Sequence, residues 1–195
     1  MKTIIATDFD GTLTTADTLL RFIRFACGNV RFVLVFTLYL PLIVLMKMRV
    51  CPNWKLKQKV FSRFFRGMDA ELFNRKCSDY AAKDRHILRP GGVEMIHKAQ
   101  ADGAEVVIVS ASMENWVQPF FPDVRVIGTR IEVKDGRLTG RFSTNNCYGA
   151  EKVRRLLEAF PDRENYRLVA YGDSGGDREL LAIADERHFK PWRNA

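Results

Sequence analysis

The residues of this chain best suited to chemistry are two carboxylates, Asp8 and Asp10, which lie one residue apart directly after the apolar run 4–6. That run predicts a short buried strand, and residues i and i+2 of a strand point the same way. If the strand ends there, both carboxylates lie past its carboxyl end, where open α/β sheets bind ligands. Two adjacent carboxylates repel each other, so a bound cation or a shared proton would stabilise the pair.

Two further apolar runs lead into polar residues that could share the same ligand. Ser110 follows directly after the predicted strand 106–109. Ser110 and the two small residues after it suit the start of a helix, where backbone N–H groups can bind phosphate oxygens. Asp173 follows the predicted strand 168–171, and Asp177 lies in the glycine-rich turn after it. Because parallel strands end at one edge of a sheet, we expect these side chains to meet in one crevice.

Lys152 is expected in the first turn of a helix over 149–160. A cation there opposes the helix dipole, and this mild cost indicates a task such as holding an anion. The carboxylates can hold Mg²⁺, a hard cation that prefers oxygen ligands and phosphate. Lys152 and Ser110 could then neutralise and orient a phosphoryl group, whose transfer needs mainly positioning and charge stabilisation. A surface lysine and a local serine turn are the alternatives.

The order of the predicted elements indicates how these residues are positioned. Strands alternating with helices predict an α/β fold with a doubly wound, mainly parallel sheet. We expect a core domain from residues 1–16 and 86–195, and a helical, basic cap from residues 17–85 inserted after the first strand. Asp17 and Asp69 are the expected helix caps in that insertion. Helices are expected over 18–26, 54–65, 70–83, 93–101, 149–160 and 178–184, and strands over 4–6, 105–109, 124–127, 130–133, 137–142 and 166–171, with a hairpin turn at Asp135-Gly136.

Length and composition indicate a globular protein. The chain has 195 residues, of which 47% are hydrophobic and 28% are charged, enough for one domain with a modest insertion. The four cysteines form no C-x-x-C pair, so we expect reduced thiols in a cytosolic compartment. The amino terminus leads directly into a core strand without the pattern of a secretory signal, which argues for a cytoplasmic protein.

Positive charge is concentrated in one part of the chain. Residues 18–68 contain ten Lys or Arg and no Asp or Glu, although the net charge of the whole chain is only +8. An ordinary solvated face mixes charges of both signs, so this segment is expected to meet an anionic partner. The candidates are a membrane surface, nucleic acid and an acidic substrate.

Within the basic segment, residues 32–46 form an uncharged apolar run. As a helix it would reach roughly 22 Å, short of the ~30 Å of a bilayer core, and Pro41 would kink or split it. A single crossing would also put Asp8 and Ser110 on opposite sides of a membrane. The run must therefore dip in and return, lie in the interface, or pack as cap core or against a second subunit. Tyr39 and Trp54 favour the interface.

Taken together, four separated motifs resemble those of the haloacid dehalogenase superfamily, most closely its phosphoserine-phosphatase-like branch. The motifs are Asp8–Thr12, Ser110, Asn146–Lys152 and Gly172–Asp177. The resemblance covers nearly the whole chain, and four motifs in the right order are far more specific than any one of them. The resemblance implies a Rossmann-like form of the predicted sheet and a Mg²⁺-dependent enzyme. The second Asp of the first motif favours a phosphatase over a dehalogenase, because protonation of the leaving oxygen needs it.

The resemblance also implies a role for each site residue. Asp8 would be the nucleophile that forms an aspartyl-phosphate, and Asp10 the acid and then the base. Mg²⁺ would be bound by the Asp8 side chain, the Asp10 backbone carbonyl and Asp173. Ser110 and Lys152 would hold the phosphoryl oxygens, and Asp177 would orient Lys152 or the water shell of the metal.

The substrate class rests on finer points of the resemblance. Phosphoserine phosphatases use Glu where Asp17 stands here and Asn where Gly176 stands, so phosphoserine fits poorly. The phosphatidylglycerophosphatase C type is more similar, with a long apolar segment in a basic cap and a Gly-x-Glu-Lys motif, here 149–152. This predicts a lipid phosphate such as phosphatidylglycerophosphate, hydrolysed by a peripheral protein at the cytoplasmic membrane face.

Two other functions stay open at this stage. A soluble phosphatase for a small phosphorylated metabolite would use the apolar run as cap core. A non-catalytic basic module would bind membrane or nucleic acid through the cap, although nucleic acid is not expected because the aromatic residues have helical core spacing. The oligomeric state cannot be read from these patterns.

Overall fold

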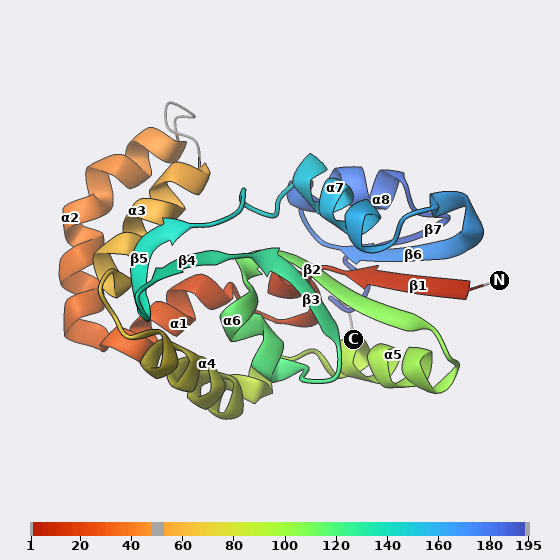
Figure 1. Ribbon diagram of the computed structural model, residues 1–195, viewed down its shortest axis with the longest axis horizontal. Helices are drawn as coiled ribbons and strands as arrows, with labels where there is room; N and C mark the ends of the chain where they lie inside the picture. Colours follow the sequence, from red (N-terminus) through yellow and green to blue (C-terminus); the bar gives the residue numbers. More distant parts are fainter. Residues whose placement is uncertain (1, 48–52, 194–195) are drawn as a thin grey trace.

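The computed structural model describes residues 2–47 and 53–193, and its centre is a five-stranded parallel sheet (Figure 1). The strand order is β3-β2-β1-β6-β7. Every neighbouring pair is parallel, so the predicted doubly wound α/β fold is confirmed. The strands are β1 (Lys2–Thr7), β2 (Glu105–Met113), β3 (Arg125–Thr129), β6 (Tyr166–Gly172) and β7 (Glu186–Phe189).

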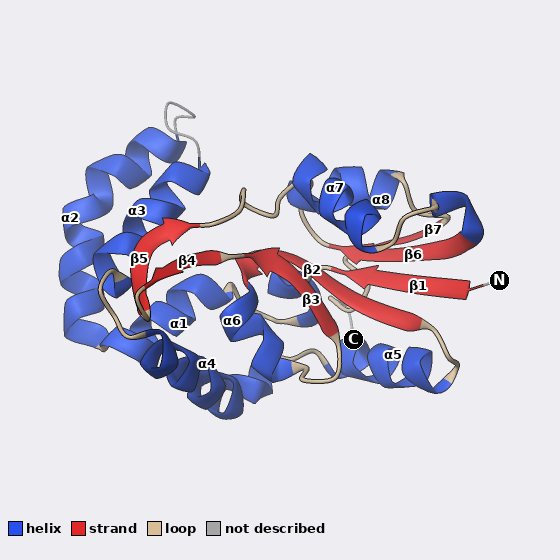
Figure 2. Cartoon of the chain, in the orientation of Figure 1, coloured by secondary structure: helices blue, strands red, loops and turns tan. Residues whose placement is uncertain are grey.

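Helices cover both faces of this sheet (Figure 2). Helix α5 (Pro90–Ala101) lies on one face, and α7 (Ala150–Ala159) and α8 (Arg178–Ala182) lie on the other. The alternation of strand side chains divides the core accordingly, because Ile5 joins the first cluster while Ile4 joins the second. The central strands β1, β2 and β6 are therefore buried on both sides, which explains their continuous apolar runs.

Four helices between β1 and β2 form the insertion expected from the sequence. They are α1 (Thr18–Cys27), α2 (Asn29–Lys47), α3 (Asn53–Phe65) and α4 (Ala70–Asp84). The Asp17 side chain accepts a hydrogen bond from Leu19 N, and the Asp69 side chain from Leu72 N, so both predicted caps are confirmed. Phe22 is central to the packing, with the rings of Phe65, Phe73, Tyr80 and Trp116 around it.

The predicted hairpin forms, and it packs against the inserted helices. Strands β4 (Ile131–Lys134) and β5 (Arg137–Phe142) pair antiparallel around the turn at Asp135-Gly136. Phe142 contacts Phe61 of α3 through their rings, and Phe142 N donates to the Gln58 side chain. The division of the chain into core and cap stays a prediction, with this hairpin lying beside the segment expected to form the cap.

Two local expectations were wrong. Strand β2 does not end before Ser110 but continues to Met113, because it pairs again with β3 at Thr129 beyond an irregularity in the register. The serine segment is thus part of a strand, and the next short helix, α6 (Glu114–Val117), begins after it. Helix α2 runs on through Pro41, so of the kink and the split expected there the split does not occur.

Helix α2 packs on α3 through one side only. Val35 is buried, and Phe36 lies against Phe64 of α3. Arg31 donates to the carbonyls of Arg63 and Phe64 at the end of α3. No helix within the described part of the chain has the length and apolar character needed to cross a membrane.

Candidate active site

All six residues predicted from the sequence line one cavity of about 730 Å³ at the carboxyl edge of the sheet. They are Asp8, Asp10, Ser110, Lys152, Asp173 and Asp177. The ends of β1, β2 and β6 supply the acids and the serine, and the first turn of α7 supplies the lysine. The topology thus brings four distant sequence motifs to one place, as expected for a parallel sheet.

Lys152 lies at the centre of this site. Its Nζ donates hydrogen bonds to Asp8 Oδ1 and to Asp177 Oδ1, both at 2.6 Å. All three side chains are buried. Burial alone would lower the pKa of Lys152, but the two carboxylates outweigh it and raise that pKa above its usual value. The lysine is therefore a fixed cation beside Asp8.

Asp177 holds Lys152 in place. Its second oxygen, Oδ2, accepts hydrogen bonds from Asp173 N at 3.1 Å and from Ser174 N and Oγ, both at 3.0 Å. Burial alone would raise the pKa of Asp177, but Lys152 and the two backbone N–H groups bring it below its usual value. Because both of its oxygens are engaged, this carboxylate acts on the site through Lys152 and the turn around residue 174.

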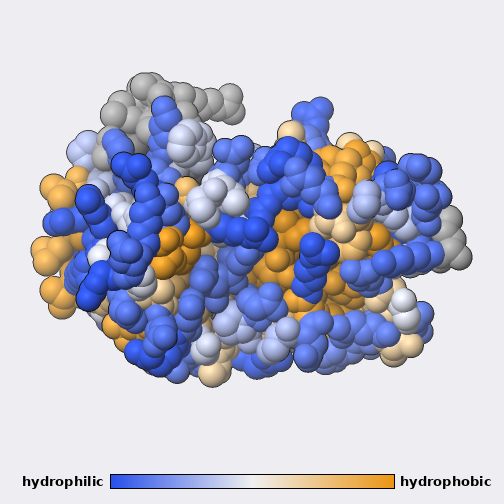
Figure 3. Space-filling model, viewed as in Figure 1, coloured by the Kyte–Doolittle hydropathy of each residue, from blue (hydrophilic) through white to orange (hydrophobic). Residues whose placement is uncertain are grey.

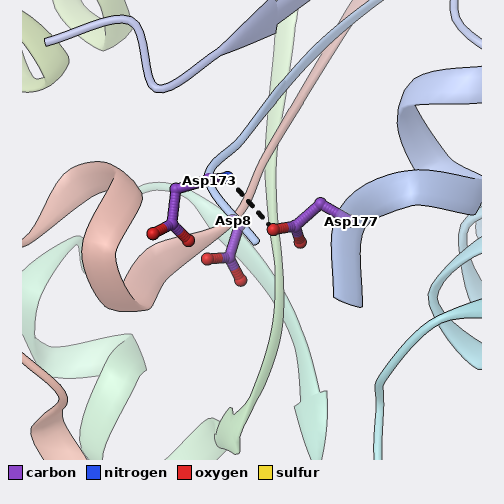
Figure 4. Close-up of side chains that lie close together, drawn as sticks. All are labelled: Asp8, Asp173 and Asp177. Atoms are coloured by element: carbon purple, nitrogen blue, oxygen red, sulfur yellow. Dashed lines mark hydrogen bonds between the residues drawn. The ribbon is translucent and has the colours of Figure 1, made fainter. Parts of the chain in front are cut away.

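Three carboxylates converge where a cation could bind. Asp8, Asp173 and Asp177 each offer an oxygen within 4.8 Å of the others, and Figure 4 shows their side chains gathered at the ends of the strands. These hard oxygen donors fit Mg²⁺. Since Asp177 already bonds Lys152 and the turn, Asp8 and Asp173 are the oxygens best placed for a metal. Arg193 also contacts Asp173 Oδ2.

Gly11 lets the chain pass close to Asp173. Its φ is +81°, and a Cβ at this position would lie 2.5 Å from Asp173 Oδ2. A side chain here would be strained and would displace the carboxylate. The glycine of the first motif therefore brings the backbone after Asp8 against the acid of the fourth.

Burial also changes the protonation of Asp8. Its side chain is only 6% exposed, and burial raises its pKa to about 7 although Lys152 opposes the rise. Thr12 Oγ1 contacts its second oxygen at 3.4 Å. A cation bound next to this carboxylate would favour its charged form.

The side chain of Asp10 bonds the serine segment and the start of α1. Its Oδ1 accepts from Thr18 N at 2.8 Å and Thr18 Oγ1 at 2.6 Å, and its Oδ2 accepts from Ser112 Oγ at 2.5 Å. Burial raises the pKa of Asp10, and these hydrogen bonds oppose the rise. A carboxyl with a raised pKa at a cavity wall can hold and release a proton.

Ser110 is buried at the cavity wall, and its Oγ accepts a hydrogen bond from Ser112 N at 3.0 Å. This places its hydroxyl among the polar groups of the cavity, on a strand rather than at the helix start expected from the sequence.

Sequence reasoning missed three residues that shape the site. Thr18 and Ser112 hold Asp10, and Lys57 of α3 reaches the cavity from the inserted helices. Ser112 was noted only as a small polar residue, and Lys57 only as one of ten basic residues. Their contacts depend on where β2 ends and on how α3 is rotated about its axis. Neither property can be predicted from the local sequence.

One wall of the cavity is apolar. It is lined by Leu19, Leu20, Phe36, Leu56 and Val60, from α1, α2 and α3. These residues come from the inserted helices, whereas the carboxylates and Lys152 of the same cavity come from the carboxyl edge of the sheet and from α7. The arrangement suits a ligand with a phosphate at one end and apolar atoms at the other.

A family model described as haloacid dehalogenase-like hydrolase matches residues 5–182, which is most of the chain. The chain belongs to this family. The hydrolase resembles Protein CicA of Caulobacter vibrioides, at 38% identity over 97% of this chain and 86% of the relative. It is also similar to the phosphoserine phosphatase of Archaeoglobus fulgidus, at 26% identity over 63% of this chain and 35% of the relative.

Solved structures share the fold of this haloacid dehalogenase-like hydrolase. A Bordetella pertussis protein of unknown function superposes with a TM-score of 0.83 at 17% identity, covering 96% of this chain and 89% of the other. A phosphoserine phosphatase with an analogue of the phospho-aspartyl intermediate gives a TM-score of 0.63 at 21% identity, covering 95% and 85%. The predicted superfamily, its phosphoserine-phosphatase-like branch and the enzyme class are confirmed, while the likeness to the phosphatidylglycerophosphatase C type stays a prediction.

Proposed function

We propose that this hydrolase is a Mg²⁺-dependent phosphomonoester phosphatase that acts on a lipid phosphate, such as phosphatidylglycerophosphate, at the cytoplasmic face of the membrane. One observation carries the catalytic part. Lys152 Nζ lies 2.6 Å from Asp8 Oδ1 and 2.6 Å from Asp177 Oδ1, inside the cavity that Asp10, Ser110 and Asp173 also line. The likeness to a phosphoserine phosphatase in sequence supports phosphate ester hydrolysis.

In the first half of the reaction, Asp8 is the nucleophile. An Asp8 oxygen forms a bond to phosphorus while the bond from phosphorus to the ester oxygen breaks. Lys152 balances the charge of the phosphoryl oxygens, with Ser110 as a further donor at the cavity wall. Protonated Asp10 gives its proton to the leaving oxygen, so an alcohol departs and an aspartyl-phosphate remains on Asp8.

In the second half, Asp10 acts as a base. Its carboxylate takes a proton from water as the water oxygen bonds to phosphorus and the Asp8–phosphate bond breaks. Inorganic phosphate leaves, and both aspartates return to their starting states. Hydrogen bonds from Thr18 and Ser112 hold the Asp10 carboxyl at the cavity that it lines.

Bound Mg²⁺ would neutralise the charge of the phosphoryl group, held by the side chains of Asp8 and Asp173 and by the Asp10 backbone carbonyl expected from the sequence. The three converging carboxylates support this assignment because they are oxygen donors of the kind that Mg²⁺ prefers. Asp177 contributes through its bond to Lys152.

The apolar wall supports a lipid substrate. Leu20 is 43% exposed at the cavity, and Phe36 lines the cavity from α2. An acyl or glyceride group could cover these side chains while the phosphate reaches Asp8. A small polar metabolite would leave this apolar surface in water.

The outer side of α2 supports contact with a membrane. Among residues 29–41, the part of α2 whose side chains are described, five apolar residues are more than half exposed: Val30, Val33, Leu34, Leu38 and Leu40. Apolar side chains gather at the edge of the molecule where α2 lies (Figure 3). Together with the basic segment 18–68, this face suits the anionic surface of the cytoplasmic leaflet.

The test is phosphate release from phosphatidylglycerophosphate in mixed micelles, with phosphoserine as the soluble comparison. We expect release from the lipid that requires Mg²⁺ and that Asp8→Asn abolishes. Release only from phosphoserine would keep the phosphatase and discard the lipid substrate. Release that persists in Asp8→Asn would contradict the assigned nucleophile.

A soluble substrate is the second candidate, because one relative in sequence and several neighbours in structure are phosphoserine phosphatases. In that case the cavity wall and α2 would serve packing or a second subunit. Lipid and soluble esters compared at equal phosphate concentration separate the two candidates directly.

A further inference from the structure

Lys57 differs from the other basic residues of segment 18–68. Among those that the structure describes, it alone lines the cavity, which it enters from α3 together with its neighbour Leu56. The exposed Lys59, two residues further on, points elsewhere. The inserted helices therefore place one particular ammonium group at the site.

The ammonium of Lys57 has only neutral partners. Its Nζ donates to the carbonyl oxygen of Ala111 at 2.6 Å and to Asn146 Oδ1 at 3.2 Å. No ion pair joins it to a carboxylate within residues 2–47 and 53–193. Burial lowers its pKa to about 8, against the opposing effect of Asp10 and Asp17. Lys57 is half-buried, and an ammonium in such a place that bonds only neutral oxygens would gain from an anion next to it.

The position of this ammonium relates it to the phosphate ester. Ala111 directly follows Ser110, which is predicted to donate a hydrogen bond to the phosphoryl oxygens. Because Lys57 bonds the carbonyl oxygen of Ala111, it lies next to the phosphoryl site. The positive charge of Lys152 is already matched by Asp8 and Asp177. Within the described site, Lys57 is the cavity cation that bonds no carboxylate, since Asp10 and Asp17 act on its charge without forming an ion pair with it.

Resting on the proposed phosphatase function, we propose that Lys57 binds a second anionic group of the substrate, close to the phosphate ester that is hydrolysed. Such a group is the phosphodiester of phosphatidylglycerophosphate or the carboxylate of a small phosphorylated acid. Lys57 would thus select substrates with two anions over esters whose remaining part is neutral. The substrate anion would replace one of the neutral oxygens that Lys57 now contacts.

The experiment compares two matched substrate pairs. Phosphatidylglycerophosphate carries a second anion and phosphatidic acid does not, and both can be presented in the same micelles. 3-Phosphoglycerate and glycerol 3-phosphate form the equivalent soluble pair. The variants are Lys57→Met, which keeps the length of the side chain, Lys57→Arg, which keeps the charge, and Lys59→Met, which removes a charge from the exposed side of α3.

For Lys57→Met we expect kcat/KM for the two-anion substrate to fall roughly tenfold or more beyond any fall for its one-anion partner, mainly through KM. Lys57→Arg should recover a large part of this difference, and Lys59→Met should cause none. An equal fall in kcat/KM for both members of a pair would overturn the proposal, since Lys57 would then bind the phosphoryl group itself or stabilise the fold. Equal activity on all substrates would overturn it as well.

Two further measurements distinguish a failure of the proposed role of Lys57 from a failure of the proposed lipid substrate. If the unmodified chain hydrolyses the soluble esters but no lipid, the lipid assignment fails and the soluble pair still decides the role of Lys57. The melting temperature of each variant shows whether it folds. If Lys57→Met does not fold, Lys57→Gln, which keeps hydrogen bonds to Ala111 and Asn146 within reach, replaces it in the same comparison.

Discussion

At the scale of single residues, Asp8 links metal binding to pH. Burial raises its pKa to about 7 in the metal-free protein, so below that pH a proton must leave before the carboxylate can bind a cation. We expect the apparent Mg²⁺ affinity to fall as the pH drops below about 7, by up to roughly tenfold per pH unit, and to level off above it. Calorimetric titration with Mg²⁺ between about pH 5.5 and about pH 8 measures this.

The stability of the protein should follow the same linkage. The folded state holds the Asp8 proton more tightly than the unfolded state, so the contribution of this group to stability is lost as the pH rises from 3.8 to about 7. Added Mg²⁺ should therefore raise the melting temperature more at about pH 8 than at about pH 5.5. A metal effect independent of pH would show that Asp8 is not a ligand. Asp10→Asn, which leaves the three converging acids intact, is the control.

Asp10 allows a separate prediction about the proton. Because its oxygens contact Thr18 and Ser112 and not the converging acids, Asp10→Asn should lower kcat while Mg²⁺ affinity stays level. The loss for an alkyl phosphate should be roughly 10²–10⁴-fold, the usual range for general acid–base catalysis. For p-nitrophenyl phosphate, the loss of rate in the first half-reaction should be much smaller, because the nitrophenolate leaving group needs no proton. Burst kinetics with both esters measure this, and equal losses in the burst rate would refute the role of acid.

The site could be predicted at some positions and not at others for physical reasons. Asp8 and Asp173 each follow directly after a buried strand, and a parallel topology brings such positions together without further information. Lys152 stood out because a cation in the first turn of a helix has a cost. Ser112 and Lys57 could not be assigned, since their contacts depend on the continued pairing of β2 with β3 and on the packing of α3.

At the scale of elements, α2 shows why the sequence of an apolar helix does not reveal which of its sides packs against the protein. Nearly all residues from 32 to 46 are apolar, so no polar stripe in the sequence marks an outer side. The structure resolves this for the part whose side chains it describes, because Val35 is buried against α3 while Leu34 and Leu38 are each 66% exposed. Packing against α3 therefore accounts for Val35, while the exposed Leu34 and Leu38 are left for the proposed membrane contact.

Substitutions on α2 test that contact. Leu34→Gln and Leu38→Gln together should weaken binding to anionic vesicles roughly tenfold or more, since each exposed leucine would otherwise leave water on docking. Neither residue lines the cavity, so turnover of a soluble ester should not change. Vesicle sedimentation and phosphate release measure the two effects. Leu72→Gln on α4, where the leucine is 39% exposed, is the matched control, and equal weakening by it would contradict a specific role of α2.

At the scale of the whole molecule, charge and chemistry are divided between two regions. The carboxyl edge of the sheet and the elements that follow it carry the acids of the site and Lys152, while the segment 18–68 carries ten basic residues and no acid. The arrangement of the sheet could be predicted from alternating elements, whereas the hairpin β4–β5 could not be placed against α3 from its own pattern. Its contact with Phe61 depends on two segments more than sixty positions apart in sequence meeting across the site.

This division of charge predicts how the whole protein meets a membrane. Each Lys or Arg near an anionic surface contributes about 1 kcal/mol, and the attraction fades beyond a Debye length of about 10 Å at 0.1 M salt. Binding to vesicles that contain phosphatidylglycerol should therefore weaken steeply as salt rises from about 0.05 M to about 0.5 M. Binding to neutral phosphatidylcholine vesicles should be weak throughout, since the apolar face of α2 acts without charge attraction. If binding is independent of salt, α2 docks alone, and the basic residues of the cap must then serve the substrate instead of the membrane surface.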